Sequence, residues 1–256
     1  AKRFDGYQPE DYHRLSAGIR CILRHHSREG HTCLPRATLE RFAAPFLAIG
    51  PELVQDTIQR MEEDGSLVAY DGGGRPCLYL PELFTAETTI AGRIALMLQL
   101  APPPVRDWEQ ETARLEEQLG IHYGAQQRRA IREAMQSPVF ILTGGPGTGK
   151  TTTLNGILTL LEGEGLQVAL AAPTGRAAKR MSEVTGRDAK TIHRLLEVEP
   201  FRDTLTFKRN EKNPLPADAI IVDEMSMVDT LILESLFRGM RLGCKLILVG
   251  DSDQLP

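Results

Sequence analysis

The sequence is poor in cysteine and in aromatic residues. It contains 4 Cys, 1 Trp and 5% aromatic residues, and no two cysteines form a C-x-x-C pair. Few cysteines without paired spacing favour free thiols in a reducing compartment, so we expect a cytoplasmic protein. No apolar run approaches the ~18 residues needed to cross a membrane, and the first residues show no signal-peptide pattern. A membrane or a disulfide-rich secreted protein is therefore not expected.

The chain also has no overall excess of positive charge. It carries 30 Lys and Arg against 34 Asp and Glu, which gives a formal net charge of −4. A surface that binds nucleic acid would therefore have to be local, because the chain as a whole repels phosphates. The length of 256 residues is enough for one large or two medium domains with ample core.

One early segment concentrates residue types that bind zinc, namely Cys21, His25, His26, His31 and Cys33. Their spacing does not match the close cysteine pairs of known zinc motifs. We therefore interpret them as core cysteines and surface histidines, and leave a metal site at Cys21, His25, His31 and Cys33 open as the alternative.

Residues 1–100 are predicted to form a mainly helical domain. Helical patterns at 11–24, 35–42 and 51–64 precede two strand-like runs at 66–70 and 77–80, joined by a glycine-rich turn. This order resembles a winged-helix module. The last helix is acidic, with Glu52, Asp56, Glu62, Glu63 and Asp64 against Arg60 alone. Since acidic groups repel phosphates, a scaffold or protein-contact role is favoured over binding in a DNA groove.

A change in the sequence pattern separates this domain from the rest of the chain. After a helical pattern at 88–100, Ala101-Pro102-Pro103-Pro104 starts a linker at 101–122 that includes a polar helix. From residue 123 to 256, apolar strands alternate with helical patterns, the strands being 139–143, 166–172, 219–223 and 245–250. This alternation predicts an α/β fold with a parallel sheet, helices on both faces and ligands at the carboxyl ends of the strands.

The stretch from Gly144 to Thr151 fits the phosphate-binding pattern G-x-x-x-x-G-K-[ST]. A short apolar strand precedes it and a helical pattern follows, so backbone N–H groups and the helix dipole would surround the phosphates of a nucleotide. Lys150 would reach the β- and γ-phosphates and Thr151 would bind Mg²⁺. The expected contacts are Gly144, Gly145, Gly147, Thr148, Gly149, Lys150, Thr151 and Thr152. The alternative is a glycine-rich turn with a chance lysine.

Two further strand ends are predicted to reach the same place. The apolar run 220–222 ends in Asp223 and Glu224, which would hold the metal ion and act as general base. Gln254 follows the strand at 245–250 and could hydrogen-bond the γ-phosphate or the attacking water. Surface acids and an ordinary polar loop are the alternatives.

A local basic segment follows the strand at 166–172. Between Thr174 and Arg194 only Glu183 and Asp188 oppose the cations Arg176, Lys179, Arg180, Arg187, Lys190 and Arg194. Backbone amides and a hydroxyl at a strand end, followed by cations, can track a phosphodiester strand, although a solvated helix face is the alternative. Ahead of the phosphate loop, Gln126 and Gln127 offer the donor and acceptor atoms that read adenine, or simply form an exposed helix face.

Taken in order, these segments resemble the motifs of superfamily 1 DNA helicases, and most closely the RecD-like branch, particularly the bacterial type that works without RecB and RecC. The resemblance spans about 123–256 and is carried by GGPGTGKTT, APTGRAAKR, TIHRLL, VDEMSM and VGDSDQLP. It implies ATP as the nucleotide, 5′ to 3′ movement along single-stranded DNA, and unwinding at duplex junctions.

The resemblance also implies roles for single residues. Gln127 would read adenine, Lys150, Asp223 and Glu224 would act in catalysis, and Gln254 would sense the γ-phosphate. The implied contacts to single-stranded DNA are Pro173, Thr174 and His193, with Arg176, Lys179 and Arg180 as the cations beside them. Such helicases have two RecA-like motor domains, so the chain is expected to hold an N-terminal domain and an incomplete first motor domain, residues 123–256.

Other classes of protein compete with this interpretation. A nucleotide kinase shares the phosphate loop but needs neither the Asp-Glu pair nor a distant Gly-Asp-x-x-Gln. The Asn-Lys-x-Asp of GTPases and the Leu-Ser-Gly-Gly-Gln of ABC ATPases are absent. A nucleotide-binding docking or regulatory module without its own unwinding activity remains the main alternative.

Overall fold

The computed structural model describes residues 8–100, 106–145, 147–201 and 204–251. Its contacts divide the chain into two compact units, one up to Thr88 and one from Thr89 onward. The border falls inside helix α4, Pro81–Gln99, for which the sequence pattern predicted only 88–100. The helix starts earlier because Pro81 suits a first turn, where its missing N–H costs nothing. Domain limits near residues 100 and 122 remain predictions.

The first unit has three helices followed by a small antiparallel sheet. The helices are α1, Tyr12–Ser27, α2, Arg36–Leu47, and α3, Pro51–Glu63, and the strands lie in the order β1, Cys33–Pro35, β3, Pro76–Tyr79, and β2, Val68–Asp71. The Asp71 carboxylate accepts the backbone N–H groups of Gly73 and Gly74, which closes the glycine-rich turn between β2 and β3. The predicted helical region with a winged-helix-like hairpin is confirmed, and β1 is an addition that the sequence pattern missed.

A single apolar core holds this unit together. It is formed by the stripes that the helical periodicity predicts, together with the inward side chains of the sheet: Leu15, Ile19, Leu23, Leu34, Leu39, Val54, Ile58, Met61 and Leu78. Asp11 accepts the backbone N–H of Arg14 at 3.1 Å and so caps the start of α1.

The second unit is built on one parallel sheet of five strands, in the order β4, Val139–Thr143, β10, Lys245–Gly250, β9, Ala219–Val222, β5, Val168–Ala172, and β6, Ala189–Thr191. All of the neighbouring pairs are parallel. The register pairs Gly250 with Thr143, and Ala172 with Thr191, so that the carboxyl ends of the strands meet at one edge. The predicted α/β fold with a parallel sheet is confirmed, whereas β6 was not predicted.

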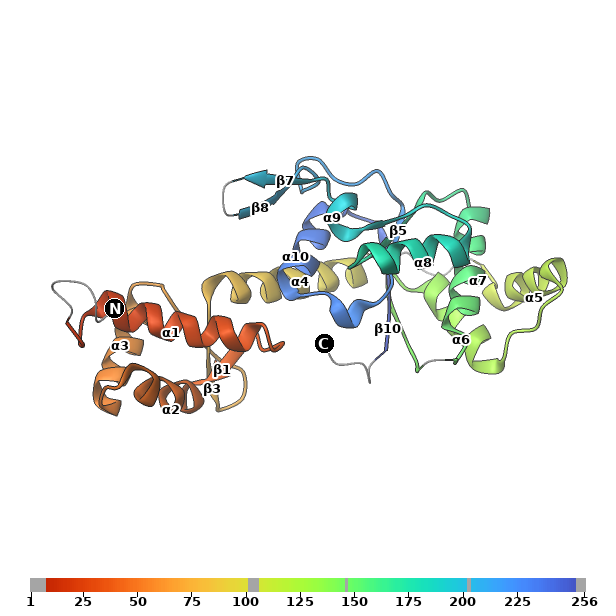
Figure 1. The fold of residues 1–256 in the computed structure, drawn as a ribbon. Coiled ribbons are helices and arrows are strands. Elements are labelled where there is room, and N and C mark those ends of the chain that lie inside the picture. Colours follow the sequence, from red (N-terminus) through yellow and green to blue (C-terminus); the bar gives the residue numbers. More distant parts are fainter. Residues whose placement is uncertain (1–7, 101–105, 146, 202–203, 252–256) are drawn as a thin grey trace. The chain divides into compact units, whose positions relative to one another are not determined.

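Helices cover both faces of this sheet, as Figure 1 shows on either side of β10. Alternate strand residues point to opposite faces, so that Ile221 and Ile247 face one core and Ile220 and Leu246 face the other. The first core includes side chains of α5, Trp108–Leu119, α6, Ala125–Gln136, α7, Lys150–Gly163, and α8, Gly175–Thr185. The second includes α9, Ile192–Leu195, α10, Thr230–Gly239, and the later part of α4.

The remaining elements of this unit are short. Strands β7, Val198–Phe201, and β8, Thr204–Phe207, form a separate antiparallel hairpin, and η1, Met225–Met227, follows β9. Across the described parts of both units, we find no helix with the length and apolar character that a membrane span requires.

Candidate nucleotide and nucleic-acid site

The loop between β4 and α7 depends on glycine at defined positions. Gly147 and Gly149 have positive φ angles of 77° and 81°, a backbone region that side chains disfavour. A Cβ added to Gly144 would lie 2.8 Å from the hydroxyl oxygen of Thr148, which is too close. Thr148 in turn donates that hydroxyl to the carbonyl of Gly145 at 2.9 Å. These contacts curl the backbone around the start of α7, where helix N–H groups are free to bind an anion.

Lys150 is the first residue of α7 and folds back over this loop. Its ammonium donates to the carbonyl of Gly145 at 3.0 Å and also to the carbonyl of Gly144. The side chain is half-buried, so its charge is held at the loop rather than in bulk solvent. Phosphate oxygens placed at the loop would compete with these two carbonyls for the same ammonium, and charge-assisted bonds to phosphate are the stronger ones.

Two acidic residues follow β9 at the same edge of the sheet. The backbone N–H of Asp223 donates to Ala171 in the neighbouring strand at 3.0 Å, and the Asp223 carboxylate accepts the N–H of Glu224 at 2.9 Å. Glu224 has a φ of 56° and a ψ of 45°, a left-handed conformation that costs free energy in a residue other than glycine. The chain therefore leaves the sheet immediately after Asp223, and Glu224 begins the turn into η1.

These segments together line one pocket of about 360 Å³. The predicted residues on its wall are Gly145, Gly147, Thr148, Gly149, Lys150, Thr151, Asp223 and Glu224. Gly144, Thr152 and Gln127 do not line it, and Gln254 lies outside the described residues. The pocket thus combines a cation, a cradle of backbone N–H groups, a hydroxyl and two carboxylates, which suits a phosphate chain with a hard cation such as Mg²⁺.

Gln127 approaches the phosphate loop from the start of α6. Its amide oxygen accepts the backbone N–H of Gly124 at 2.9 Å, and its amide nitrogen donates to the carbonyl of Gly149 at 3.3 Å. Both ends of the amide are therefore used inside the protein, where they tie α6 to the loop. A role of Gln127 in reading adenine remains a prediction.

Comparison with known proteins places the chain in a family. A family model described as an AAA domain matches residues 127–256. The ATP-dependent RecD2 DNA helicase of Deinococcus radiodurans is 34% identical over 259 residues, covering 96% of this chain and 35% of that protein. The RecBCD enzyme subunit RecD of Mycobacterium tuberculosis is 42% identical over 153 residues, covering 51% of this chain and 26% of that protein. The chain belongs to this AAA domain family, and the two relatives that it resembles are RecD proteins.

Family membership confirms the predicted RecD-like resemblance and the P-loop, RecA-like character of the parallel sheet. The RecD-like chain spans about a third of the length of the first relative and about a quarter of the second. The roles of single residues are not decided by these comparisons and stay predictions.

The predicted DNA-contacting segments of the RecD-like chain also meet at the carboxyl edge of the sheet. Pro173 and Thr174 directly follow β5, and His193 lies in α9, directly after β6, the strand next to β5. Thr174 caps α8 by accepting the backbone N–H of Ala177 at 3.2 Å. The His193 ring is half-buried and lies 6.0 Å from the ring of Phe207. The structure thus brings these segments together on neighbouring strand ends.

The cations of the basic segment fall into two groups. Lys179 lies 3.9 Å from Glu183, Lys190 lies 3.8 Å from Asp188, and Arg187 is paired with Glu162 of α7 at 2.6 Å. In the described part of the chain, Arg176, Arg180 and Arg194 form no ion pair. Arg187 therefore connects the segment after α8 to α7, and the three arginines without an ion pair are the ones available to a ligand.

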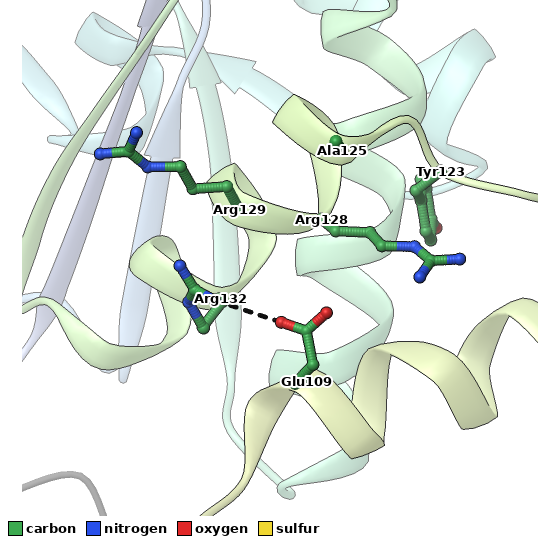
Figure 2. Close-up of a pocket in the computed structure, with 6 residues that line it drawn as sticks. All are labelled: Glu109, Tyr123, Ala125, Arg128, Arg129 and Arg132. Carbon is green, nitrogen blue, oxygen red and sulfur yellow. Dashed lines mark hydrogen bonds and ion pairs between the residues drawn. The ribbon is translucent and has the colours of Figure 1, made fainter.

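A second pocket of about 430 Å³ lies between α5 and α6, close to Gln127 in sequence (Figure 2). Its arginines are already paired: Arg132 with Glu109 at 3.2 Å, as the dashed line shows, Arg128 with Glu116, and Arg129 with Glu133. The buried Glu116 carboxylate also accepts the N–H of Tyr123 at 2.6 Å, and this bond, followed by the charge of Arg128, lowers the pKa of Glu116. We assign this cluster to packing of α5 on α6.

The nucleotide pocket also contains two charged residues that the sequence did not assign to it, Asp251 and Arg180. Asp251 follows β10, is 7% exposed, and lines the pocket beside Gly250. An acid directly after an apolar strand was the signal that revealed Asp223, and the same signal could have found Asp251. Arg180 was predicted on the DNA side, yet it lines the nucleotide pocket with Met181 and Val184.

Proposed function

We propose that the full-length protein is an ATP-dependent DNA helicase, which moves along single-stranded DNA in the 5′ to 3′ direction and opens duplex junctions. One observation carries the proposal: a single pocket is lined by Lys150 and Thr151, from the start of α7, and by Asp223 and Glu224, from the end of β9. One relative is an ATP-dependent RecD2 DNA helicase, and the other is the RecD subunit of the RecBCD enzyme, which supports the proposal. We also propose that the protein is located in the cytoplasm, where it has access to DNA.

Hydrolysis would use the residues of this pocket in distinct roles. Lys150 and the backbone N–H groups of the loop would bind the β- and γ-phosphates, and Thr151 and Asp223 would hold Mg²⁺. When bound there, the ion would supply positive charge that offsets the charge of the phosphates. Glu224 would accept a proton from the attacking water. The water oxygen would bond to the γ-phosphorus while the bond from that phosphorus to the bridging oxygen breaks and ADP leaves. Gln254 would sense the γ-phosphate.

Helix α8 offers a direct connection between this chemistry and DNA. It begins at Thr174, in the segment proposed to contact single-stranded DNA, and its side chains Arg180, Met181 and Val184 line the nucleotide pocket. A rigid element that touches two ligands transmits a shift at one to the other. We infer that Pro173, Thr174 and His193, with the exposed Arg176 and Lys179, form the DNA side, and that Arg180 belongs to the nucleotide side.

Steady-state ATP hydrolysis by the full-length protein, with and without single-stranded oligonucleotide, tests this coupling. We expect faster hydrolysis with the oligonucleotide. In the same assay Arg180→Ala should raise the KM for ATP by about tenfold, the loss expected for one charge-assisted hydrogen bond. The matched variant Arg176→Ala should instead raise the oligonucleotide concentration needed for half-maximal stimulation.

Two results would count against the proposal. A rate of ATP hydrolysis that does not change when the oligonucleotide is added would favour a nucleotide-binding docking or regulatory module. An Arg180→Ala variant with an ordinary KM for ATP but weakened stimulation would place this arginine on the DNA side.

A further inference from the structure

Three side chains of metal-binding type converge where α1 ends, in the N-terminal unit. His26, Glu29 and His31 place their ligand atoms within 4.8 Å of one another. The two histidines and the carboxylate lie within six positions of the chain, so one local turn forms the whole cluster. This cluster is separate from the nucleotide pocket and does not depend on the proposed function.

The backbone of the turn holds the three residues in place. The N–H groups of Glu29 and His31 both donate to the carbonyl of His26, at 3.0 and 3.1 Å. Between them, Gly30 has a φ of 90°, a conformation that other residues rarely adopt. The chain therefore reverses directly after α1 and brings His31 back beside His26. A metal-binding set that is ordered by its own backbone loses little entropy when an ion binds.

The ring of His26 is also fixed by its neighbours. It stacks on Phe42 of α2 with 5.1 Å between the ring centres and an angle of 18° between the planes. Its Nδ1 atom lies 3.0 Å from a carboxylate oxygen of Glu29, and the Nε2 atom of His25 lies 3.6 Å from the other oxygen. A metal ion bound by both groups would replace this direct contact between His26 and Glu29. The C-terminal end of a helix, with its partial negative charge, favours a cation there.

The cysteines that accompanied these histidines in the sequence do not join the cluster. Cys21 is exposed on α1, and Cys33 lies on β1, where it pairs with Tyr79 of β3. The structure therefore replaces the set Cys21, His25, His31 and Cys33 with a set that contains nitrogen and oxygen donors only.

We propose that His26, Glu29 and His31 bind one divalent transition metal ion of the zinc class. Two imidazoles and one carboxylate suit Zn²⁺, and they disfavour Mg²⁺ and Ca²⁺, which prefer oxygen donors alone. Three protein ligands leave a further position for water. The ion joins the end of α1 to the turn that leads into β1, so its role is to stabilise the N-terminal unit.

Calorimetric titration of the full chain with Zn²⁺, in excess Mg²⁺, tests the proposal. We expect one equivalent of Zn²⁺ to bind, and His31→Ala to weaken binding by at least about tenfold. His31 is exposed, so this variant should fold. The matched control is His13→Ala, which removes an exposed histidine of α1 outside the cluster and should bind Zn²⁺ like the parent.

Co²⁺ as a spectroscopic probe separates this site from a thiol site. The proposal requires d–d bands without thiolate charge-transfer absorption, and the same bands in Cys33→Ala. Zn²⁺ should raise the melting temperature of the parent but not of His31→Ala. Equal Zn²⁺ affinity in the parent and His31→Ala, or loss of binding only in Cys33→Ala, would overturn the proposal.

Discussion

Replacing Glu224 with glutamine should leave Mg·ATP binding nearly intact while ATP turnover falls by about 10²-fold or more. Glutamine matches the size of glutamate but cannot accept a proton from water. The glutamine should also keep the left-handed backbone conformation at this position. The strain of that conformation comes from the Cβ atom, which both residues have, and not from the charge of the side chain. Fluorescent-nucleotide titration and steady-state hydrolysis, performed on the same preparation, separate the two quantities.

The adjacent Asp223→Asn variant is the matched comparison. Asp223 is proposed to hold the metal ion, so its amide should weaken Mg²⁺-dependent nucleotide binding as well as turnover. The assignment of Glu224 as base would be wrong if Glu224→Gln lost nucleotide binding, or if it hydrolysed ATP at the parent rate.

Replacing Lys150 with alanine should weaken nucleotide binding and hydrolysis together. Its ammonium lies at the loop, within reach of the Gly144 and Gly145 carbonyls, and among the described residues Lys150 is the one lysine that lines the pocket. Loss of one preorganised neutral donor to a developing oxyanion costs about 10²–10³-fold in rate, and Lys150 is charged, so we expect kcat/KM to fall by at least that order. Fluorescent-nucleotide titration and steady-state hydrolysis measure the two effects.

Lys212→Ala serves as the control, because Lys212 is exposed and does not line the pocket. It should bind and hydrolyse ATP like the parent. Parent-like nucleotide affinity in Lys150→Ala would show that the loop backbone alone binds the phosphates.

The nucleotide pocket could be predicted from sequence because its signals are local. A strand, a glycine loop and a helix start are contiguous in the chain, and the apolar runs that end in Thr143, Asp223 and Gly250 became β4, β9 and β10. Parallel strands that end in polar residues must share one edge, which brought Lys150 and Glu224 together without any knowledge of strand order.

What depends on three-dimensional packing could not be predicted in the same way. The order of the strands, with β10 between β4 and β9, is set by contacts between segments far apart in sequence. The short strand β6 is formed by pairing with β5, and its own three residues show no strand pattern. Likewise, the packing of α8 decides which of its faces lines the nucleotide pocket. That face contains Arg180, so the position of Arg180 at this pocket could not be predicted.

The same limit applies to the histidine-rich segment of the first unit. Sequence proximity suggested a set with two cysteines, but a turn closed by Gly30 selects His26 and Glu29 as partners of His31. Backbone reversal at a single glycine decides which side chains meet, and spacing alone does not show it.

Unwinding of a forked duplex by the full-length protein tests the central claim most directly. Two forks should be compared, one with a free 5′ single-stranded tail and one with a free 3′ tail, each with and without ATP. We expect strand separation of the 5′-tailed fork that requires ATP and is lost in Glu224→Gln. If a preparation that hydrolyses ATP separates neither fork, the proposed helicase activity is contradicted.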